Sequence, residues 1–365
     1  MEYLPDFFQE ILLENLRDGD LAKLSSESKY YNDIKFTKSQ LDEMKNLLNL
    51  KEIYNMKNYN KLIKLSDVIL LKELHLDNSI IQSFDIFSGK TFPNLKLLDL
   101  NNNQISSFDI FSRQIFPNLK ELWLNFNQIS SFKGLSGEIF PNLKMLFLDN
   151  NQITSFKELY GKTFPNLEYL NLSVNQITSF DIFSGQTFPN LKKLYLNSNQ
   201  IELFQGLSGE IFPNLEELWL RNNQISSVEG LSGKIFPNLK YLYLSDNQIT
   251  FLDIFSEQTF PNLEYLDLSD NQIESFQGLS EKTFPKLKKF ILNTNQITSF
   301  KGLSGKTFPK LEKLGLYRNQ ISSLEGLSEK TFPKLKYLTL LGNDELSSEM
   351  IEHYQAKIHN AVIIY

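Results

Sequence analysis

The sequence predicts a solenoid of the α/β class, in which one curved parallel sheet of about 12 strands grows by one strand per repeat. Phe-Pro pairs recur at one constant interval from Phe92 to Phe332. The second pair, at Phe116, follows Phe92, and each later pair follows at the same distance. Each pair leads into the spacing Leu-x-x-Leu-x-Leu-x-x-Asn, with Phe290 in place of one leucine, and an earlier copy without Phe-Pro starts at Leu71. A repeat this short cannot bury its own apolar face, so we expect neighbouring copies to bury it for one another.

One repeat shows why the spacing predicts a strand. Leu98 and Leu100 alternate as strand residues do, so they point to one side, and Asp99 is left toward solvent or a partner. Asn103 recurs in every later repeat, and its short amide can bond to the backbone where the chain leaves the strand. Phe108 and its equivalents are all apolar. We therefore expect an asparagine ladder and an apolar spine beneath the strands.

The repeated stretch resembles leucine-rich repeats, and the resemblance covers roughly residues 68–346. We expect strands to begin near Leu71, near Leu95 and then once per repeat up to Leu335. Returns such as 108–115 are short and hold Gly or Ser, so they predict turns or 3₁₀ segments rather than long helices. Residues 347–365 predict a C-terminal cap, with a helix that opens at Ser347 or Ser348 and a short strand over 361–365.

The composition of the chain limits the cellular compartments and the classes of partner that we expect for it. The chain has 365 residues, no cysteine and a formal net charge of −6. The absence of cysteine fits a reducing compartment, and the first residues lack the features of a signal peptide. No apolar run reaches the ~18 residues of a membrane span. No basic run stands out. We expect a cytoplasmic protein that binds neither membrane nor nucleic acid.

The first residues differ from the repeats and predict a small helical unit over residues 1–36. Pro5 suits the first turn of a helix, and Asp20 suits the cap of a second one. Apolar residues recur on one side of each helix. The run over residues 4–34, with Leu4-Pro5-Asp6, Asp20-Leu21 and Lys23-Leu24-Ser25 among its landmarks, resembles the F-box. Residues 37–67, which are rich in lysine and asparagine, predict a helical bridge and first cap.

The F-box resemblance implies docking onto a Skp-type adaptor of a cullin–RING ubiquitin ligase. The residues implied in this contact are Leu4, Pro5, Ile11, Leu12, Leu16, Leu21 and Leu24. The alternative is that this amphipathic segment only covers the exposed first edge of the solenoid, as terminal repeats must.

The strand positions that vary between repeats predict a second binding site. Both tryptophans of the chain stand at the position between the two inward leucines, and several tyrosines stand there or two residues earlier. Strand alternation places both positions on the concave face, and such residues are enriched at binding hot spots. The candidate target-binding residues are Trp123, Phe147, Tyr169, Tyr195, Trp219, Tyr241, Tyr243 and Tyr265. The alternative is that the rings stack on each other for structural reasons alone.

Two substitutions follow from this interpretation. Trp219→Ala is expected to weaken target binding and to change stability little, because Leu218 and Leu220 carry the core. Asp99→Ala is expected to change neither.

The charged positions predict structure rather than chemistry. Residues just before each strand alternate in sign from Lys192 to Lys336, which indicates register and solubility. The three histidines are scattered and no Gly-rich phosphate loop occurs, so we expect neither an enzyme nor a cofactor or metal. Asp267 and Asp270 resemble an acid or metal pair, but a solvated face is the simpler interpretation.

The resemblances together imply the substrate-recognition subunit of an SCF-type cullin–RING ubiquitin ligase. Its F-box would dock the adaptor and its repeats would bind an unknown target protein, in the cytoplasm or, for a viral chain, the host cytoplasm. One alternative is a stand-alone leucine-rich-repeat scaffold. Another is a pathogen-type repeat protein that occludes a host enzyme.

Overall fold

The computed structural model divides into two compact units, Met1–Asn171 and Leu172–Tyr365. The described residues are 35–36, 72–82, 92, 94–111, 116–155, 164–180, 188–204, 212–231, 234, 236–252, 260–279, 283–303, 308–355, 358 and 361–365. The F-box-like run over 4–34 and the expected bridge over 37–67 therefore lie outside the described part of the chain.

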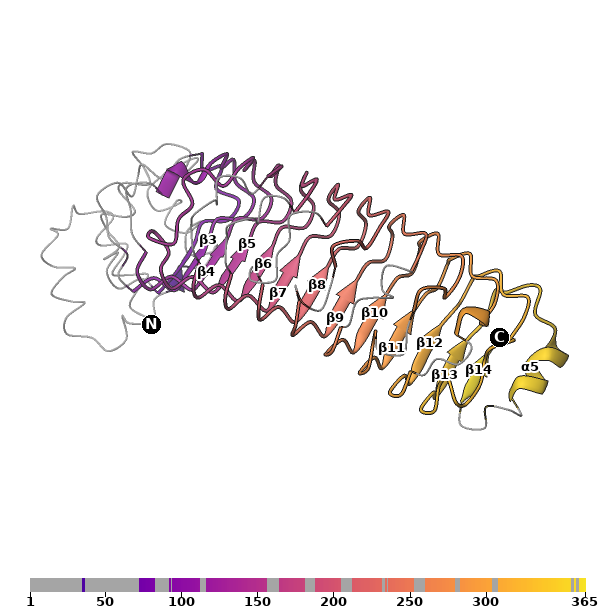
Figure 1. Ribbon diagram of the computed structural model, residues 1–365. Helices are drawn as coiled ribbons and strands as arrows, with labels where there is room; N and C mark the ends of the chain where they lie inside the picture. Colours follow the sequence, from indigo (N-terminus) through magenta and orange to yellow (C-terminus); the bar gives the residue numbers. More distant parts are fainter. Residues whose placement is uncertain are drawn as a thin grey trace, which may run out of the picture. The chain divides into compact units, whose positions relative to one another are not determined.

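In the first unit, every strand pairs in parallel with the next one along the chain. The strands are β1 (Lys35–Phe36), β2 (Glu73–His75), β3 (Leu97–Asp99), β4 (Glu121–Trp123), β5 (Met145–Phe147) and β6 (Tyr169–Asn171). Corresponding leucines face each other across the sheet, as Leu98 does with Leu74 and Leu122. Figure 1 shows the strand arrows side by side and pointing the same way.

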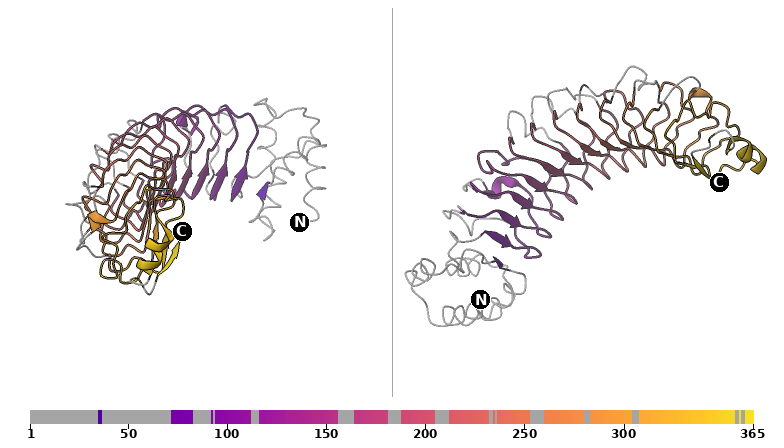
Figure 2. Two further views of the ribbon diagram at one scale, coloured as in Figure 1. Left: turned by 90° about the vertical axis from the view of Figure 1, so that its right-hand side faces the viewer. Right: turned by 90° about the horizontal axis from the view of Figure 1, so that it is seen from below.

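The second unit repeats this arrangement and adds a helix at its end (Figures 1 and 2). Its strands are β7 (Lys193–Tyr195), β8 (Glu217–Trp219), β9 (Tyr241–Tyr243), β10 (Tyr265–Asp267), β11 (Lys289–Ile291), β12 (Lys313–Gly315), β13 (Tyr337–Thr339) and β14 (Val362–Ile364). Helix α5 (Ser348–Gln355) precedes β14.

The predicted strands β2–β13 are confirmed, one in each repeat and at the same place in each. Each begins two positions after the first leucine of its repeat, because that leucine still belongs to the turn before the strand: the backbone N of Leu95 donates to the oxygen of Phe92 at 3.4 Å. The predicted strand near the C-terminus is β14. Strand β1 was not predicted, because its two residues carry no Leu-x-Leu pattern.

The predicted helix near the C-terminus is α5. The Oγ of Ser347 accepts a hydrogen bond from the backbone N of Met350 at 3.2 Å, as an N-cap residue does. The returns between strands contain turns and the short 3₁₀ segments η3 (Phe108–Phe111) and η7 (Lys301–Leu303). No helix in the described ranges combines the length and the apolarity needed to cross a membrane.

The core of each unit consists of inward leucines and stacked phenylalanine rings. Leu98 and its equivalents in the other strands are buried. Phe108 stacks on Phe132 with ring centroids 6.1 Å apart, and Phe276 stacks on Phe300 at 5.7 Å. A fully buried Leu or Phe stabilises a protein by roughly 1.5–3 kcal/mol relative to an exposed one. The predicted apolar spine is therefore present, and it supports the strands from below.

The predicted asparagine ladder joins each repeat to the one before it. Asn223 is buried, and its Nδ2 donates to the carbonyl oxygens of Leu196 and Leu220, both at 3.0 Å. Its Oδ1 accepts from the backbone N of Ile201 at 3.0 Å. One side chain thus satisfies three buried backbone groups at the turn out of the strand, which regular strand pairing leaves unpaired.

Candidate binding face

The side of each sheet opposite the core is the candidate site, and we call it the strand face. In strands such as β8, the middle residue Leu218 is buried, whereas Glu217 and Trp219 on either side are partly exposed. The strand face is therefore built from the first and third residues of each strand, as alternation predicts.

In the second unit, the strand face carries a contiguous group of aromatic rings, which we call the Trp219 cluster. Trp219 stacks on Tyr195 at 5.3 Å and on Tyr243 at 3.7 Å between ring centroids, with interplanar angles of 18° in both pairs. Tyr243 also contacts Tyr265 at 4.9 Å, and Tyr241 pairs with Tyr265 across β9 and β10. All five side chains remain partly exposed, so they form a surface and not a second core.

Charged side chains lie against the polar atoms of the Trp219 cluster. The Nε1 of Trp219 lies 3.4 Å from Oε2 of Glu217, and Lys193 pairs with Glu217 at 2.9 Å. Burial, with a smaller contribution from Asp267, raises the pKa of Tyr265 to about 12, and burial likewise raises the pKa of Tyr243. The hydroxyl of Tyr265 lies 3.5 Å from Oδ2 of Asp267, to which it can donate.

In the first unit, three of the expected residues lie together, and we call them the Trp123 cluster. Trp123 meets Phe147 edge-on at 5.7 Å, and Phe147 lies 4.8 Å from Tyr169. The Nε1 of Trp123 is buried and has no hydrogen-bond partner among the described residues. The Trp123 cluster belongs to the first unit and the Trp219 cluster to the second.

At strands β2 and β3 of the first unit, the strand face carries a charged group. The Nδ1 of His75 lies 3.3 Å from Asp99, and its Nε2 lies 3.6 Å from Glu73. Asp99 is buried, and its other oxygen accepts from the backbone N of Asn101 at 3.0 Å. Asp99 therefore has two polar partners, which the repeat spacing alone did not reveal.

The alternating charges before the strands pair as predicted. Lys240 contacts Glu216 at 2.9 Å, and Lys288 contacts Glu264 at 2.7 Å. In the first unit, Lys144 contacts Glu168 at 2.7 Å. These exposed pairs link successive repeats, and each contributes little to stability by itself.

The candidate acid pair has a structural explanation. Asp267 accepts hydrogen bonds from the backbone N and the Oγ of Ser269, at 3.0 and 2.7 Å. Asp270 stands beyond the strand, at a position with a positive φ of 53°. The described part of the chain shows no group of three or more histidine, aspartate or glutamate residues suited to a metal ion.

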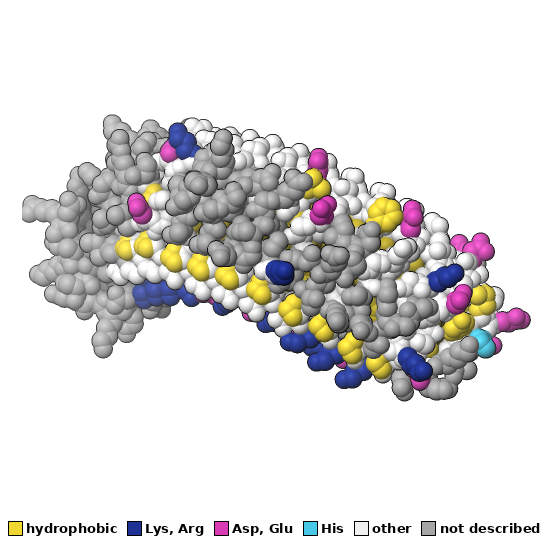
Figure 3. Space-filling view, in the orientation of Figure 1, with side chains coloured by type: hydrophobic (Ala, Val, Ile, Leu, Met, Phe, Trp, Pro, Cys, Tyr) yellow, Lys and Arg dark blue, Asp and Glu magenta, His cyan; other side chains and the backbone are white. Residues whose placement is uncertain are grey.

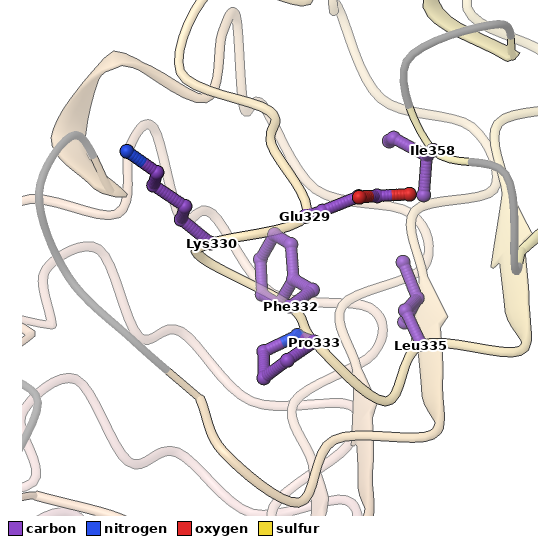
Figure 4. A pocket seen from close by; sticks show the side chains of 6 residues that line it. All are labelled: Glu329, Lys330, Phe332, Pro333, Leu335 and Ile358. Atoms are coloured by element: carbon purple, nitrogen blue, oxygen red, sulfur yellow. The ribbon is translucent and has the colours of Figure 1, made fainter.

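A shallow pocket of about 210 Å³ lies where the end of the chain meets the last repeat (Figure 4). Its lining is Glu329, Lys330, Phe332, Pro333, Leu335 and Ile358. Phe332, Leu335 and Ile358 are buried, so this pocket belongs to the contact between the C-terminal segment and the repeats.

Sequence reasoning missed a group of lysines beside the strands of the last repeats. Lys286, Lys310 and Lys334 hold the same place in consecutive repeats, and Lys289 is the strand partner of Lys313. Dark-blue lysine and arginine side chains gather along the lower edge of the space-filling view (Figure 3). These residues form no run in the sequence because they stand one full repeat apart, so only the repeat alignment could have found them.

Comparison with known proteins identifies the class of fold. A family model described as leucine-rich repeats in two copies matches residues 117–161, 165–209, 213–257 and 261–305. The chain therefore carries leucine-rich repeats, and its fold is a leucine-rich-repeat solenoid of parallel strands. No curated protein sequence matches the chain.

Solved structures show the same fold at low sequence identity. A chain in the octameric complex of latrophilin 3, Unc5D and FLRT2 is 19% identical, with a TM-score of 0.61, covering 80% of this chain and 89% of that one. The leucine-rich-repeat domain of APL1B is 18% identical, with a TM-score of 0.55 and coverages of 96% and 93%. A chain of the Toll–Spätzle complex of Drosophila is 20% identical, with a TM-score of 0.61 and coverages of 80% and 40%.

Proposed function

We propose that this chain is a non-enzymatic scaffold that binds a target protein on the strand face of its second unit. The Trp219 cluster carries this proposal, because it places five partly exposed aromatic side chains together above a core that is already filled. Burying such rings contributes ~25 cal/mol per Å² of apolar area, and contiguous apolar patches on soluble proteins mark binding sites.

Stacking between neighbouring strands does not by itself explain the cluster. Strands β11–β13 have Ile291, Gly315 and Thr339 at the position where β7–β9 have aromatics. The same strands pair in the same register and bury their middle residues equally well. Aromatic rings are therefore dispensable for strand pairing, and their restriction to part of the face supports a binding role. The similar structures include leucine-rich-repeat chains in protein complexes, such as Toll with Spätzle.

The test of this proposal is the affinity of the isolated target for variants of the full chain. Trp219→Ala removes the central ring and should weaken binding by ~2 kcal/mol or more, as a hot-spot residue does. Thr339→Ala is the matched control, because Thr339 holds the same strand position outside the cluster. Equal affinities of the two variants would show that the target binds elsewhere.

A more specific role rests on the F-box resemblance of residues 4–34. In this role the chain is the substrate-recognition subunit of a cytoplasmic SCF-type ubiquitin ligase, with Leu4 and Pro5 at the start of the adaptor contact. Holding a target beside a ubiquitin-conjugating enzyme would raise the effective concentration of its lysines. The alternative, for a chain that binds no adaptor, is a stand-alone leucine-rich-repeat scaffold without a role in a ubiquitin ligase.

The adaptor contact is tested by a double substitution. Replacing Leu4 and Pro5 by alanine should abolish co-purification of a Skp-type adaptor, because it removes the apolar start of the docking segment. The circular dichroism and melting temperature of the repeats should stay unchanged. If the wild-type chain fails to bind purified adaptor, the ubiquitin-ligase role is excluded and the stand-alone scaffold is retained.

A further inference from the structure

Five exposed lysines gather beside strands β11–β13, and we call them the lysine patch. The patch consists of Lys286, Lys289, Lys310, Lys313 and Lys334. Lys289 and Lys313 stand directly opposite each other in the parallel register of β11 and β12. Lys334 lies close enough to Glu312 to help lower the pKa of that carboxyl, whose main partner is Lys336. The patch is thus continuous over three neighbouring repeats.

The patch departs from the charge pattern that the same repeats use elsewhere. One position earlier, opposite charges alternate and make contacts of 2.7 to 2.9 Å, as between Lys288 and Glu264. At the strand position itself, Lys193 faces Glu217 at 2.9 Å. Like charges directly opposite each other destabilise a sheet. The pairing of Lys289 with Lys313 therefore works against the fold, and such local conflicts are expected at functional sites.

The turn before the strand shows a second departure. In earlier repeats this position is asparagine, and its side chain bonds to the preceding repeat: Asn238 donates to the oxygen of Pro213 and Asn262 to that of Pro237, both at 2.8 Å. In the last three repeats the position is lysine. In these repeats, lysine ammonium groups thus replace the asparagine amides that donate these hydrogen bonds. The ammonium group of Lys286 contacts Oδ1 of Asn262 at 2.6 Å.

The lysine patch continues directly from the Trp219 cluster, because Tyr265 is the strand partner of Lys289. We propose that the patch binds an acidic stretch of the same protein segment whose apolar side chains contact the Trp219 cluster. This inference rests on the proposed function and adds the charge of the target. An acidic stretch would remove the repulsion within the patch, since its carboxylates would lie between the ammonium groups.

The observations favour an acidic protein segment over nucleic acid. Single-stranded nucleic acids bind by stacking bases on free aromatic faces. Here Trp219 already has a ring on each side, at 5.3 and 3.7 Å. Glu264 and Glu312 also lie beside the patch, where they accept hydrogen bonds from Lys288 and Lys336. Their carboxylates would repel a continuous phosphate backbone that ran along the patch.

The experiment measures fluorescence anisotropy of labelled short probes with the full chain at low and high salt. The probes are oligoglutamate, oligoglutamine and oligothymidylate, and a separate assay uses vesicles that contain phosphatidylserine. The test variant is Lys289→Glu with Lys313→Glu, which keeps a like-charge pair across the two strands. The control variant is Lys301→Glu with Lys330→Glu, which changes the net charge equally at exposed positions outside the patch.

We expect oligoglutamate to bind better than oligoglutamine, and the test variant to weaken oligoglutamate binding by about tenfold or more while the control stays within about twofold. Added salt should weaken the binding. The inference would be overturned if oligoglutamate and oligoglutamine bound equally well, or if the test and control variants lost the same oligoglutamate affinity. It would also be overturned if oligothymidylate or the vesicles bound more tightly than oligoglutamate and this binding depended on the lysines of the patch.

Trp219→Ala separates this inference from the proposed function. Oligoglutamate has no apolar anchor, so its binding should survive this substitution even though target binding is lost. If target binding depends on Trp219 but oligoglutamate does not bind the wild-type chain, only the acidic character of the target is excluded.

Discussion

The indole of Trp219 contacts a tyrosine ring on each side, and this changes one expectation drawn from the sequence. Stacked aromatic pairs contribute about 0.5–1.5 kcal/mol each beyond buried area. Trp219→Ala should therefore cost about 1–3 kcal/mol of stability as well as affinity. The repeat period located the residue correctly, but ring orientation depends on neighbouring side chains and could not be derived from the spacing.

His75 makes a pH dependence testable at the scale of one residue. The hydrogen bond to Asp99, opposed by burial and aided by Glu73, raises the pKa of His75 above its usual value. A raised folded-state pKa gives a contribution to stability that is complete below about pH 6.5 and is lost as pH rises through the folded pKa. The wild-type chain should thus lose more unfolding free energy than His75→Gln between about pH 6 and about pH 8.5.

Urea denaturation of both proteins at the two pH values measures this difference. Glu73 and Asp99 remain in both proteins, so the comparison isolates the imidazole. Identical pH dependence in the two proteins would show that the contacts at 3.3 and 3.6 Å do not favour the charged ring in solution.

At the scale of the element, each strand depends on the asparagine that follows it. Asn223→Ala would leave the buried N–H of Ile201 without the partner that Asn223 provides. It would also remove one of the two asparagine hydrogen bonds at each of the carbonyls of Leu196 and Leu220, which keep Asn199 and Asn247 as donors. The unsatisfied N–H costs ~1–3 kcal/mol and each lost hydrogen bond a further ~0.5–1.5 kcal/mol, so we expect a loss of at least ~2 kcal/mol in the free energy of unfolding.

Gln224→Ala is the matched control, because this next residue is exposed and recurs in every repeat from Gln104 to Gln320. Its change should stay within about 0.5 kcal/mol. Equal losses from the two substitutions in a denaturation experiment would contradict the role given to the ladder.

The elements could be predicted well because their cause is local and periodic. Alternating leucines, the asparagine and the Phe-Pro turn recur at one constant interval, so one repeat explains the others. What could not be predicted arises from contacts between residues distant in the sequence. The pairing of β1 with β2 joins Lys35 to Glu73, and the lysine patch joins residues of three repeats. Neither has a signal within one short stretch of sequence.

At the scale of the whole molecule, one repeated scaffold carries several surfaces of different chemistry. The Trp219 cluster and the lysine patch lie on the second unit, whereas the Trp123 cluster and the His75 group lie on the first. The inward positions are nearly uniform among repeats, so the differences between repeats are concentrated on the strand face. The varied positions therefore serve recognition in the proposed function, and the constant positions serve stability.

The most direct measurement is photo-crosslinking in cells from a benzoylphenylalanine placed at Tyr241, which belongs to the Trp219 cluster. A matched chain carries the same group at Gln224, an exposed position outside the strand face. We predict that position 241 captures a specific protein that position 224 does not, and that adding Trp219→Ala abolishes this capture while the chain remains folded by circular dichroism. Capture from position 224 alone, or capture from 241 that survives Trp219→Ala, would contradict a target site on the strand face.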